Sequence, residues 1–467
     1  MRLRSRLFSI LLSVIFSSCT LFAQSASTST LSGDVTDPTG AVVSGAEIIL
    51  TDISTNASQR ATSNQAGHYS FPSVQPGEYK LTVKKERFRQ TTTTFTVSVG
   101  INVSQNIKLE VGGANEIVEV QATGQELQTA DASVGNVLDR ATLQSLPSLS
   151  RDATALLQLQ PMAAPSYNAG PGTSGGEGNT TSGGVAGALN DQNTFNLDGG
   201  DATSNTEGDA NYNSGMGTPQ AVVPTPVESI EEFRVTTNNS NTFARSSGAQ
   251  VQLVTRRGTN QWHGAGWEYN QNTDYNANFW QLNHAQEPRP VWQDNRFGGR
   301  IGGPILKDKA FFFLMYEGRR FRKGETFTRN VPSALLRQGI LQFQDANVAG
   351  QIDQFNFAAG APTAQCASGP CDPRGLGMDP IVSQIWNTYE PQGNNASEGD
   401  GLNFVGFDST VPVISHEYDG IARLDYNLTK NWTISGVGRY AVVDINGSSQ
   451  IDIGGLLPGD KLGVPKS

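Results

Sequence analysis

Residues 416–440, HEYDGIARLDYNLTKNWTISGVGRY, contain two runs of alternating side chains around a short polar break. Successive side chains of a β-strand point to opposite faces of its sheet, so this alternation separates an apolar, aromatic face from a polar, charged one. The pattern predicts two strands joined by a tight turn at 428–431. The apolar face comprises Tyr418, Ala422, Leu424, Tyr426, Trp432, Ile434, Tyr440 and Val442, and the polar face Glu417, Asp419, Arg423, Asp425, Thr433, Ser435 and Arg439.

Three more strands are expected upstream of this pair. Near residue 265 an aromatic set alternates with glycines and an acid, and near residue 300 apolar residues alternate with arginines. The dense apolar run 311–316 indicates another strand, whose two faces the pattern does not distinguish. The alternating sets are Ala265, Trp267 and Tyr269 against Gly264, Gly266 and Glu268, then Phe297 and Ile301 against Arg296 and Arg300.

The connections between these five strands run long, short, long, short. Residues 271–294 and 323–415 are long, whereas 304–309 and 428–431 are tight. Outer-membrane barrels have this asymmetry, with short periplasmic turns and long extracellular loops. A soluble antiparallel sheet would also alternate, but it would not require this order of connections. We therefore expect residues 259–467 to be the first strands of a transmembrane β-barrel.

Five strands cannot close a barrel of this kind, since barrels with a plugged lumen use about 22. An open sheet edge inside a bilayer would leave backbone N–H and C=O groups without partners. The barrel is therefore expected to be incomplete, and the chain to be a truncated product or an N-terminal fragment.

Residues 1–25 have the pattern of a secretory signal peptide. Arginines precede the apolar run 7–16, which is too short to cross a bilayer as a helix, and small residues follow it. Cleavage is expected between Ala23 and Ala26. Cys19 offers a lipoprotein alternative, but the residues before it fit a lipobox poorly. The net charge of −10 and the scattered basic residues give no footprint for nucleic acid, so DNA and RNA are not expected as partners.

Between residues 31 and 109, short β-branched or aromatic runs alternate with turn signals such as Asp-Pro-Thr-Gly. This spacing predicts an all-β sandwich of about seven strands. The stretches LSGDVTDPTGAVVSGAEIIL (31–50) and QAGHYSFPSVQPGEYKLTV (65–83) resemble the carboxypeptidase regulatory-like domain. The resemblance implies a transthyretin-like sandwich over residues 27–112. Relatives of that fold bind starch, so it also implies carbohydrate as a candidate ligand.

Three aromatic residues of this segment, Tyr69, Phe71 and Tyr79, have rings that could stack on a saccharide. At strand positions such rings more often pack in a core or against a neighbouring strand. Packing is therefore the expected role, and saccharide stacking is the alternative.

The linker expected at 113–125 contains a short extended run that could add as an edge strand to a partner sheet. The run is Glu116, Ile117, Val118, Glu119 and Val120. It resembles the TonB box, the segment through which transporters of this class are pulled by an energised inner-membrane complex. The alternative is that it forms the last strand of the sandwich.

Residues 126–258 are expected to form the next domain. Leucines around Pro147 indicate two short helices separated by the proline, and a Gly/Ser/Asn-rich stretch follows at 166–217. The segment resembles the plug domain of TonB-dependent receptors, in which a strand ending in an apolar-Asp-Gly turn is typical. The features that carry the resemblance are Leu197, Asp198 and Gly199, followed by the strand-like runs 230–236 and 248–255.

Cys366 and Cys371 lie close together in the Gly/Pro-rich run CASGPCDPRG of an exported chain. A local disulfide is the expected state outside the reducing cytoplasm, and two free thiols are the alternative.

Metal sites, cofactors and catalytic sites are not expected. Carboxylates in the Gly-rich stretch lack the ligand spacing of a calcium loop, so a solvated loop is expected there. His284, Glu287 and His416 have a spacing similar to the zinc ligands of metallocarboxypeptidases, but no α/β pattern surrounds them. The carboxylates are Asp198, Asp201, Glu207 and Asp209.

The runs 250–269, 295–318 and 416–440 resemble Oar-like TonB-dependent receptors, in which a regulatory-like domain precedes a plug and a barrel. The implied fold is mainly β: a transthyretin-like β-sandwich, a plug, and a partial antiparallel transmembrane β-barrel. The implied protein is a non-enzymatic outer-membrane transporter or receptor, with its N-terminal domain in the periplasm. It would take up or export a bulky ligand such as a saccharide or peptide.

The partners that this resemblance implies are a TonB-type energy-coupling complex, outer-membrane lipid and an extracellular ligand. The alternative is a surface or periplasmic carbohydrate-binding module without transport activity.

Overall fold

The computed structural model describes the chain from residue 28 to residue 446 with internal gaps. Two compact units are present, and each is described by itself. The first comprises Met1–Gly266, Gly299–Glu317 and Asp419–Ala441, and the second Trp267–Gly298, Gly318–Tyr418 and Val442–Ser467. The described residues are 28–112, 117–121, 135–146, 151–165, 183–185, 187–188, 193–203, 225–237, 248–278, 280–284, 289–345, 348–357, 365–366, 369–370, 376–429 and 432–446.

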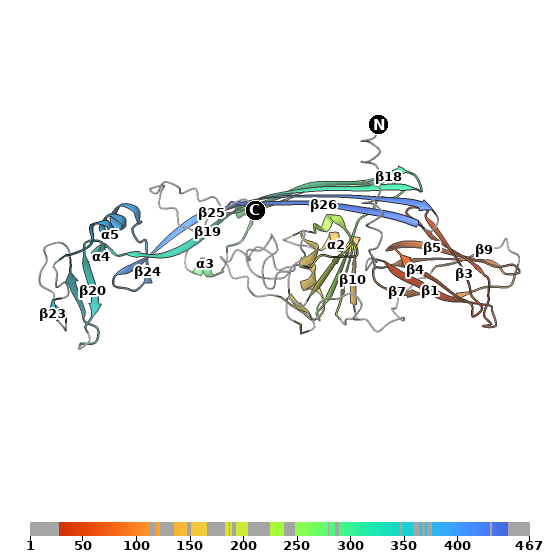
Figure 1. Ribbon diagram of the computed structural model, residues 1–467, viewed down its shortest axis with the longest axis horizontal. Helices are drawn as coiled ribbons and strands as arrows, with labels where there is room; N and C mark the ends of the chain where they lie inside the picture. The colour runs from red at the N-terminus through yellow and green to blue at the C-terminus, as the bar shows by residue number, and fades with distance from the viewer. Residues whose placement is uncertain are drawn as a thin grey trace, which may run out of the picture. The chain divides into compact units, whose positions relative to one another are not determined.

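The N-terminal part of the first unit is a β-sandwich, drawn in red and orange in Figure 1. Its strands are β1 (Ser29–Thr36), β2 (Glu47–Asp52), β3 (Ser58–Thr62), β4 (His68–Val74), β5 (Gly77–Lys84), β6 (Gln90–Val97), β7 (Asn102–Ser104), β8 (Ile107–Lys108) and β9 (Ile117–Gln121). One sheet has the order β4-β1-β7, with β8 also paired to β1, and the other has the order β3-β2-β5-β6-β9. Strand β9 runs parallel to β6 and ends the second sheet.

Alternation along the strands builds the sandwich core. In β5, Tyr79, Leu81 and Val83 are buried, whereas Lys80 and Lys84 are exposed. This follows from the period of two in a strand, which sends every second side chain toward the other sheet. The other large members of the core cluster are Leu31, Val35, Ile48, Leu50, Tyr69, Phe71, Val74, Phe95, Val97 and Leu109.

A five-stranded sheet with short helices follows in the same unit. Its elements are β10 (Gly135–Asp139), α2 (Arg140–Ser145), η2 (Ala153–Leu159), β11 (Ala163–Pro165), β12 (Gly183–Val185), β13 (Thr194–Leu197), β14 (Gly200–Asp201), η4 (Val227–Ser229), β15 (Ile230–Thr236) and β16 (Gln250–Thr255). The strand order is β10-β15-β16-β13-β14, and β11 pairs with β12 separately. The helical segments α2 and η2 lie on either side of Pro147, which is outside the described residues. Every residue of β16 is buried, which places this strand inside the domain.

The C-terminal half forms a six-stranded sheet. Its strands are β17 (His263–Asn272), β18 (Trp292–Leu306), β19 (Ala310–Pro332), β24 (Asn395–Gly399), β25 (Phe404–Thr429) and β26 (Trp432–Asn446). The order is β17-β18-β19-β25-β24, and β26 also pairs with β25; four of the long strands are labelled in Figure 1. The connections 307–309 and 430–431 are too short for a crossover, so the strands that they join are antiparallel. The mainly-β class with a partial antiparallel barrel is confirmed.

Strands β19 and β25 are longer than the sequence pattern predicts, because part of the expected connection 323–415 is strand. The added part of β19 is mostly polar and that of β25 has apolar residues on both faces, so a clean hydrophobic alternation marks neither. No helix in the described part of the chain has the length and apolar character needed to cross a membrane. The smaller elements of the two long connections are η5 (Thr273–Tyr275), α3 (Trp280–His284), α4 (Ala334–Arg337), β20 (Ile340–Gln344), β21 (Ile352–Asn356), β22 (Gln365–Cys366), β23 (Gly369–Pro370), α5 (Pro380–Gln384) and η6 (Ile385–Tyr389).

The structure distinguishes the two faces of β19, which the sequence left open. Phe311 and Phe313 are buried, whereas Leu314 and Tyr316 are 45% and 46% exposed. In the neighbouring β18, the apolar Ile301 is exposed while the guanidinium of Arg300 is largely buried. The sheet thus exposes apolar side chains and buries charged ones, which is the reverse of a water-soluble sheet and typical of a lipid-facing barrel wall.

The substitution Leu81→Ala is expected to lower the free energy of unfolding of the sandwich by about 2–5 kcal/mol, because it opens a cavity in a fully buried position. Amide hydrogen exchange of β2, β5 and β6 in the full chain under increasing urea would measure the loss. The neighbouring Lys80→Ala, on the exposed side of the same strand, is the matched control and should change little. Equal exchange in both variants would contradict the assigned core.

Candidate functional site

Leu197, Asp198 and Gly199 form a tight turn between β13 and β14. Asp198 and Gly199 have positive φ angles of 51° and 86°, and Leu197 pairs with Gly200 across the turn. Positive φ at both central residues is the geometry of a type I′ hairpin, which Asp-Gly sequences adopt readily. The expectation of a solvated loop is therefore wrong for Asp198, because this residue belongs to an ordered hairpin.

The carboxylate of Asp198 is held by the neighbouring strand. Its Oδ1 accepts a hydrogen bond from the backbone N–H of Thr255 at 2.7 Å, and its Oδ2 accepts one from the Thr255 hydroxyl at 2.5 Å. Thr255 is the last residue of β16, which runs parallel to β13. These two bonds fix the orientation of the carboxylate at the edge of the five-stranded sheet.

Two arginines of the barrel strands lie against this carboxylate. Guanidinium nitrogens of Arg423 in β25 and Arg439 in β26 are 3.8 Å and 3.7 Å from the oxygens of Asp198. Arg423 also donates to the backbone oxygen of Thr255 at 2.7 Å, and Arg439 donates to the hydroxyl of Thr255. A carboxylate within the barrel wall, Asp425, binds Arg423 at 2.9 Å. The two arginines therefore hold the turn of the five-stranded sheet against the wall.

A second ionic cluster centres on Glu228 in η4. Arg151 donates to Glu228 at 2.9 Å, and Gln144 donates to it at 3.2 Å. Arg300, on the buried charged face of β18, forms an ion pair with the other carboxylate oxygen of Glu228. Glu228 is thus shared between an arginine of its own domain and an arginine of the barrel wall.

We call the sheet β10-β15-β16-β13-β14 with its short helices the plug-like sheet. The ionic latch is then defined by Asp198 in its β13–β14 turn, Glu228 in its helix η4, and Arg300, Arg423 and Arg439 on the barrel strands. A cavity of about 600 Å³ lies beside Asp198, Arg423 and Arg439. Buried ion pairs of this kind give register and position rather than large net stability, because desolvation opposes the Coulomb attraction. Among the described residues, no group of three or more His, Cys, Asp or Glu is arranged to hold a metal ion. The arrangement fixes the position of the plug-like sheet against the barrel strands.

A different contact joins the sandwich to the plug-like sheet. Glu232 of β15 accepts a hydrogen bond from the backbone N–H of Val99 at 2.8 Å, and Arg234 donates to the backbone oxygen of Val99 at 2.9 Å. Val99 lies in the turn between β6 and β7. Glu232 is 6% exposed, and its burial raises the pKa of its carboxyl to about 7. The N–H and the C=O of Val99 are therefore both hydrogen-bonded to charged side chains of β15.

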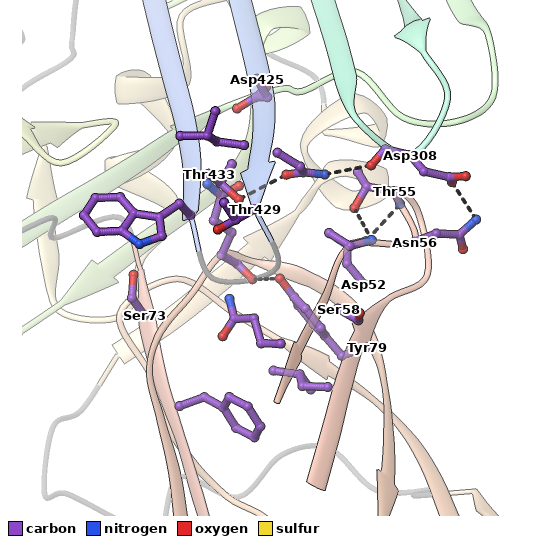
Figure 2. A pocket seen from close by; sticks show the side chains of 18 of the residues that line it. Asp52, Thr55, Asn56, Ser58, Ser73, Tyr79, Asp308, Asp425, Thr429 and Thr433 are labelled. Atoms are coloured by element: carbon purple, nitrogen blue, oxygen red, sulfur yellow. Dashed lines mark hydrogen bonds between the residues drawn. The ribbon is translucent and has the colours of Figure 1, made fainter. Parts of the chain in front are cut away.

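The sandwich also borders a cavity of about 710 Å³, shown in Figure 2. Asp52 forms an ion pair with Arg257 at 2.8 Å, at the start of the barrel segment. Asn56 donates to the carboxylate of Asp308, in the turn between β18 and β19, at 2.9 Å. Asn260 donates to the same carboxylate oxygen at 2.8 Å. The labelled residues of the sandwich and of the short turns face this cavity together in Figure 2.

The three aromatic residues considered for saccharide stacking lie in the sandwich core. Tyr69, Phe71 and Tyr79 are 2%, 3% and 6% exposed, and Tyr69 and Phe71 make an edge-to-face ring contact. Burial also raises the pKa of the Tyr79 hydroxyl to about 12. Stacking on a sugar needs an open ring face, and these exposures leave little of any ring accessible. Their positions agree with the packing role, although Phe71 and Tyr79 border the larger cavity.

The backbone of Ile117, Val118, Glu119 and Val120 lies in β9, paired with β6, while Glu116 is outside the described residues. Cys366 falls in the short strand β22 and Cys371 lies outside the described residues, so the expected disulfide stays a prediction.

The two histidines considered as zinc ligands have other surroundings. His284 ends α3 and stacks on Trp280, with ring centroids 5.0 Å apart. His416 lies within β25, and Glu287 is outside the described residues, as are Glu207 and Asp209. Asp201 accepts a hydrogen bond from the backbone N–H of Thr203 in a local turn.

Sequence reasoning placed the latch arginines on the charged face of the strands but assigned them no partners, and it missed Glu228 and Glu232. The run 230–236 holds three charged residues among seven, so its composition did not mark Glu232 as a buried acid. The partners themselves come from segments far away in the sequence, so no local pattern shows them.

Family models match two parts of the chain. Residues 30–110 match the carboxypeptidase regulatory-like domain, and residues 254–460 match an outer membrane beta barrel domain. The curated TonB-dependent transporter Oar of Myxococcus xanthus is 24% identical over 329 residues, covering 66% of this chain and 28% of that protein. The chain therefore spans less than a third of the length of this relative. The expected resemblance to Oar-like receptors and the outer-membrane location are confirmed.

Two solved structures of outer-membrane receptors are also similar. The siderophore receptor PirA from Acinetobacter baumannii is 15% identical, with 68% of this chain and 46% of that chain covered and a TM-score of 0.30. The alcaligin receptor FauA from Bordetella pertussis is 11% identical, with 70% and 42% covered and a TM-score of 0.32.

The substitution Asp198→Ala is expected to weaken the β13–β14 hairpin by about 1–3 kcal/mol, because it removes the acceptor for Thr255 and the counter-charge for two buried arginines. Hydrogen exchange of the β13 and β16 amides in the full chain should rise by about tenfold or more, since 1.4 kcal/mol corresponds to a factor of ten. Asp201→Ala, at an exposed position of the same hairpin, is the control. Unchanged protection in Asp198→Ala would contradict the latch.

The segment around Val99 is expected to become less stable as the pH rises, because the buried carboxyl of Glu232 must then ionise in a desolvated position. The folded-state pKa of Glu232, about 7, lies above the ordinary value of 4.5, so its contribution is complete below 4.5 and lost as the pH passes 7. The difference across this window is on the order of 3 kcal/mol. Exchange of the 98–101 amides, corrected for intrinsic rates, would be compared at pH 5.5 and 8. Glu232→Gln should remove the pH dependence, and an identical dependence in this variant would exclude Glu232 as its source.

Proposed function

We propose that this chain works as part of a TonB-dependent outer-membrane transporter or receptor that moves a bulky ligand, such as a saccharide or peptide, across the outer membrane. The observation that carries this proposal is the ionic latch between the plug-like sheet and the barrel strands. A plug that must block the barrel at rest and give way during transport needs contacts that are specific and reversible. The latch residues Asp198, Arg423 and Arg439 have both properties.

The physical basis of release is water entry. An ion pair that loses its partner inside a dry interface is costly, but the cost falls when water can solvate the separated charges. The cavity of about 600 Å³ beside Asp198, Arg423 and Arg439 provides a place for such water. An apolar interface of the same size would gain nothing from hydration. The latch therefore suits a domain that is repeatedly displaced and restored.

The force for displacement is proposed to come from a TonB-type complex that acts on Glu116, Ile117, Val118, Glu119 and Val120. Support comes from the position of β9, which pairs with β6 on one side and ends the sheet β3-β2-β5-β6-β9. An edge strand offers unpaired N–H and C=O groups that a partner strand can bind. In this proposal the sandwich lies in the periplasm, where the partner is found.

The carbohydrate-binding module is less well supported. The aromatic rings that would stack on a sugar are core residues, and the sandwich is tied to other parts of its unit through Glu232 and Arg257. A free-standing module would not need either tie.

Proline substitutions at Val118 and Glu119 test the strand-addition step. The N–H groups of successive strand residues point to opposite sides, so one substitution removes a bond to β6 and the other removes an outward donor. At least one should lower pull-down of the full chain by the periplasmic domain of a TonB-type protein tenfold or more. Outer-membrane fractionation of both variants should be unchanged.

The matched control is Glu119→Gln, which keeps the backbone N–H and should bind normally. If both proline variants bind as well as the unaltered chain while remaining in the outer membrane, the segment is not the contact.

A further inference from the structure

An arginine with an unusual environment lies on the outward face of the barrel strands in the second unit. The guanidinium of Arg320 is 4.5 Å from the ring centroid of Tyr418 and 5.7 Å from that of Phe297. It donates to the Tyr418 hydroxyl at 2.9 Å and to the backbone oxygen of Arg319 at 2.8 Å. Two aromatic side chains therefore fix the plane of this cation without neutralising it.

The preceding residue, Arg319, is an arginine of the same strand that is neutralised by carboxylates. Arg319, on the opposite face of β19, donates twice to Asp294 at 2.7 Å and 2.9 Å and once to Glu417 at 2.9 Å. Arg320 and the exposed Arg322 have no carboxylate partner among the described residues. Arg319 therefore belongs to the ion pairs on the inner face of the strands, whereas Arg320 and Arg322 on the outer face do not.

Two described acids share this face by strand alternation, Asp408 of β25 and Asp444 of β26, and neither forms an ion pair with Arg320 or Arg322. Strand alternation places Arg320 and Arg322 on the face of Leu314 and Tyr316, which are exposed. The other described residues of β18, β19 and β25 nearest to the two arginines on this face are Gln293, Asn295, Phe297, Tyr316, Gly318, Gly324, Pro412, Ile414, His416, Tyr418, Gly420 and Ala422. The two arginines are therefore not neutralised by the described acids and are available to an external anion.

The position along the strand identifies the region of the membrane. Phe297, Arg320 and Tyr418 stand ten to twelve residues from the short turns 307–309 and 430–431. A strand crosses the hydrocarbon core in about 9–11 residues, and the short turns of such barrels are periplasmic. These three residues therefore lie at the outer border of the core, where aromatic girdles occur and lipid phosphates are found.

We infer that Arg320 and Arg322, framed by Phe297 and Tyr418, bind the phosphate group of an outer-leaflet glycolipid. The planar guanidinium can donate two parallel N–H bonds to phosphate oxygens, and the stacked rings hold it in the orientation that this requires. The exposed apolar residues of the same strand, Leu314 and Tyr316, would contact the acyl chains. The inference depends on the outer-membrane location and not on the proposed transport activity.

Binding of lipid A that carries two phosphates to the full chain in non-ionic detergent, measured by native mass spectrometry, tests this inference. The same lipid without phosphates should bind at least about tenfold more weakly, because the charge-assisted bonds are lost. The double variant R320Q/R322Q should reduce the affinity for the phosphorylated lipid by a similar factor. R320K, which keeps the charge but loses the planar fork, should fall between the two.

Arg60→Gln is the matched control, because Arg60 is an exposed arginine of the sandwich that pairs with Glu47. It should bind as the unaltered chain does. Equal affinity for the lipid with and without phosphates would overturn the inference, as would unchanged binding by both R320Q/R322Q and R320K. Complete displacement by inorganic phosphate alone would identify a free-anion site and would overturn the assignment to lipid.

Discussion

The charged inner face of the barrel strands is the constraint on which the rest of the structure depends. Strand alternation buries Arg300, Arg319, Arg423 and Arg439 as an unavoidable consequence of exposing the apolar residues between them. A buried guanidinium without a partner is costly, so each must find a carboxylate or carbonyl. Some partners lie within the wall, as with Arg319, and others belong to the plug-like sheet, as with Arg300 and Arg439. The barrel strands and the five-stranded sheet therefore supply each other's counter-charges.

The positions of the long strands could be predicted from the sequence, because side chains of a lipid-facing wall alternate with a period of two. This alternation can be recognised without knowing which strands pair. The faces of β18, β25 and β26 follow directly from it. The faces of β19 did not, since Phe311 to Tyr316 is apolar on both sides, and burial in the folded chain was needed to separate Phe313 from Leu314. The far ends of β19 and β25 were missed because neither shows a clean alternation: that of β19 is mostly polar, and that of β25 has apolar residues on both faces, such as Val413 and Ile414.

The candidate site was harder to predict than the fold. Leu197, Asp198 and Gly199 were found by resemblance, but their surroundings were assigned to a solvated loop, because the glycine-rich composition on both sides hides an ordered hairpin. The partners of Asp198 come from residues near 255, 423 and 439. The same limit applies to Tyr69, Phe71 and Tyr79, since a strand pattern is identical for a core ring and for a ring that binds a ligand. Burial distinguishes the two roles, and the burial of a side chain cannot be read from a single sequence.

The parallel pairing of β9 with β6 gives the chain a direction-dependent mechanical strength. Five residue pairs, from Gln90 with Ile117 to Thr94 with Gln121, join the two strands. A pull along the strand axis loads these pairs together, whereas a pull across it opens them one after another, at a much lower force. The direction of the force applied to this segment therefore determines which part of the molecule unfolds first. A force along β9 is transmitted into the sandwich. A force perpendicular to β9 separates this strand from β6 while the rest of the sandwich stays folded.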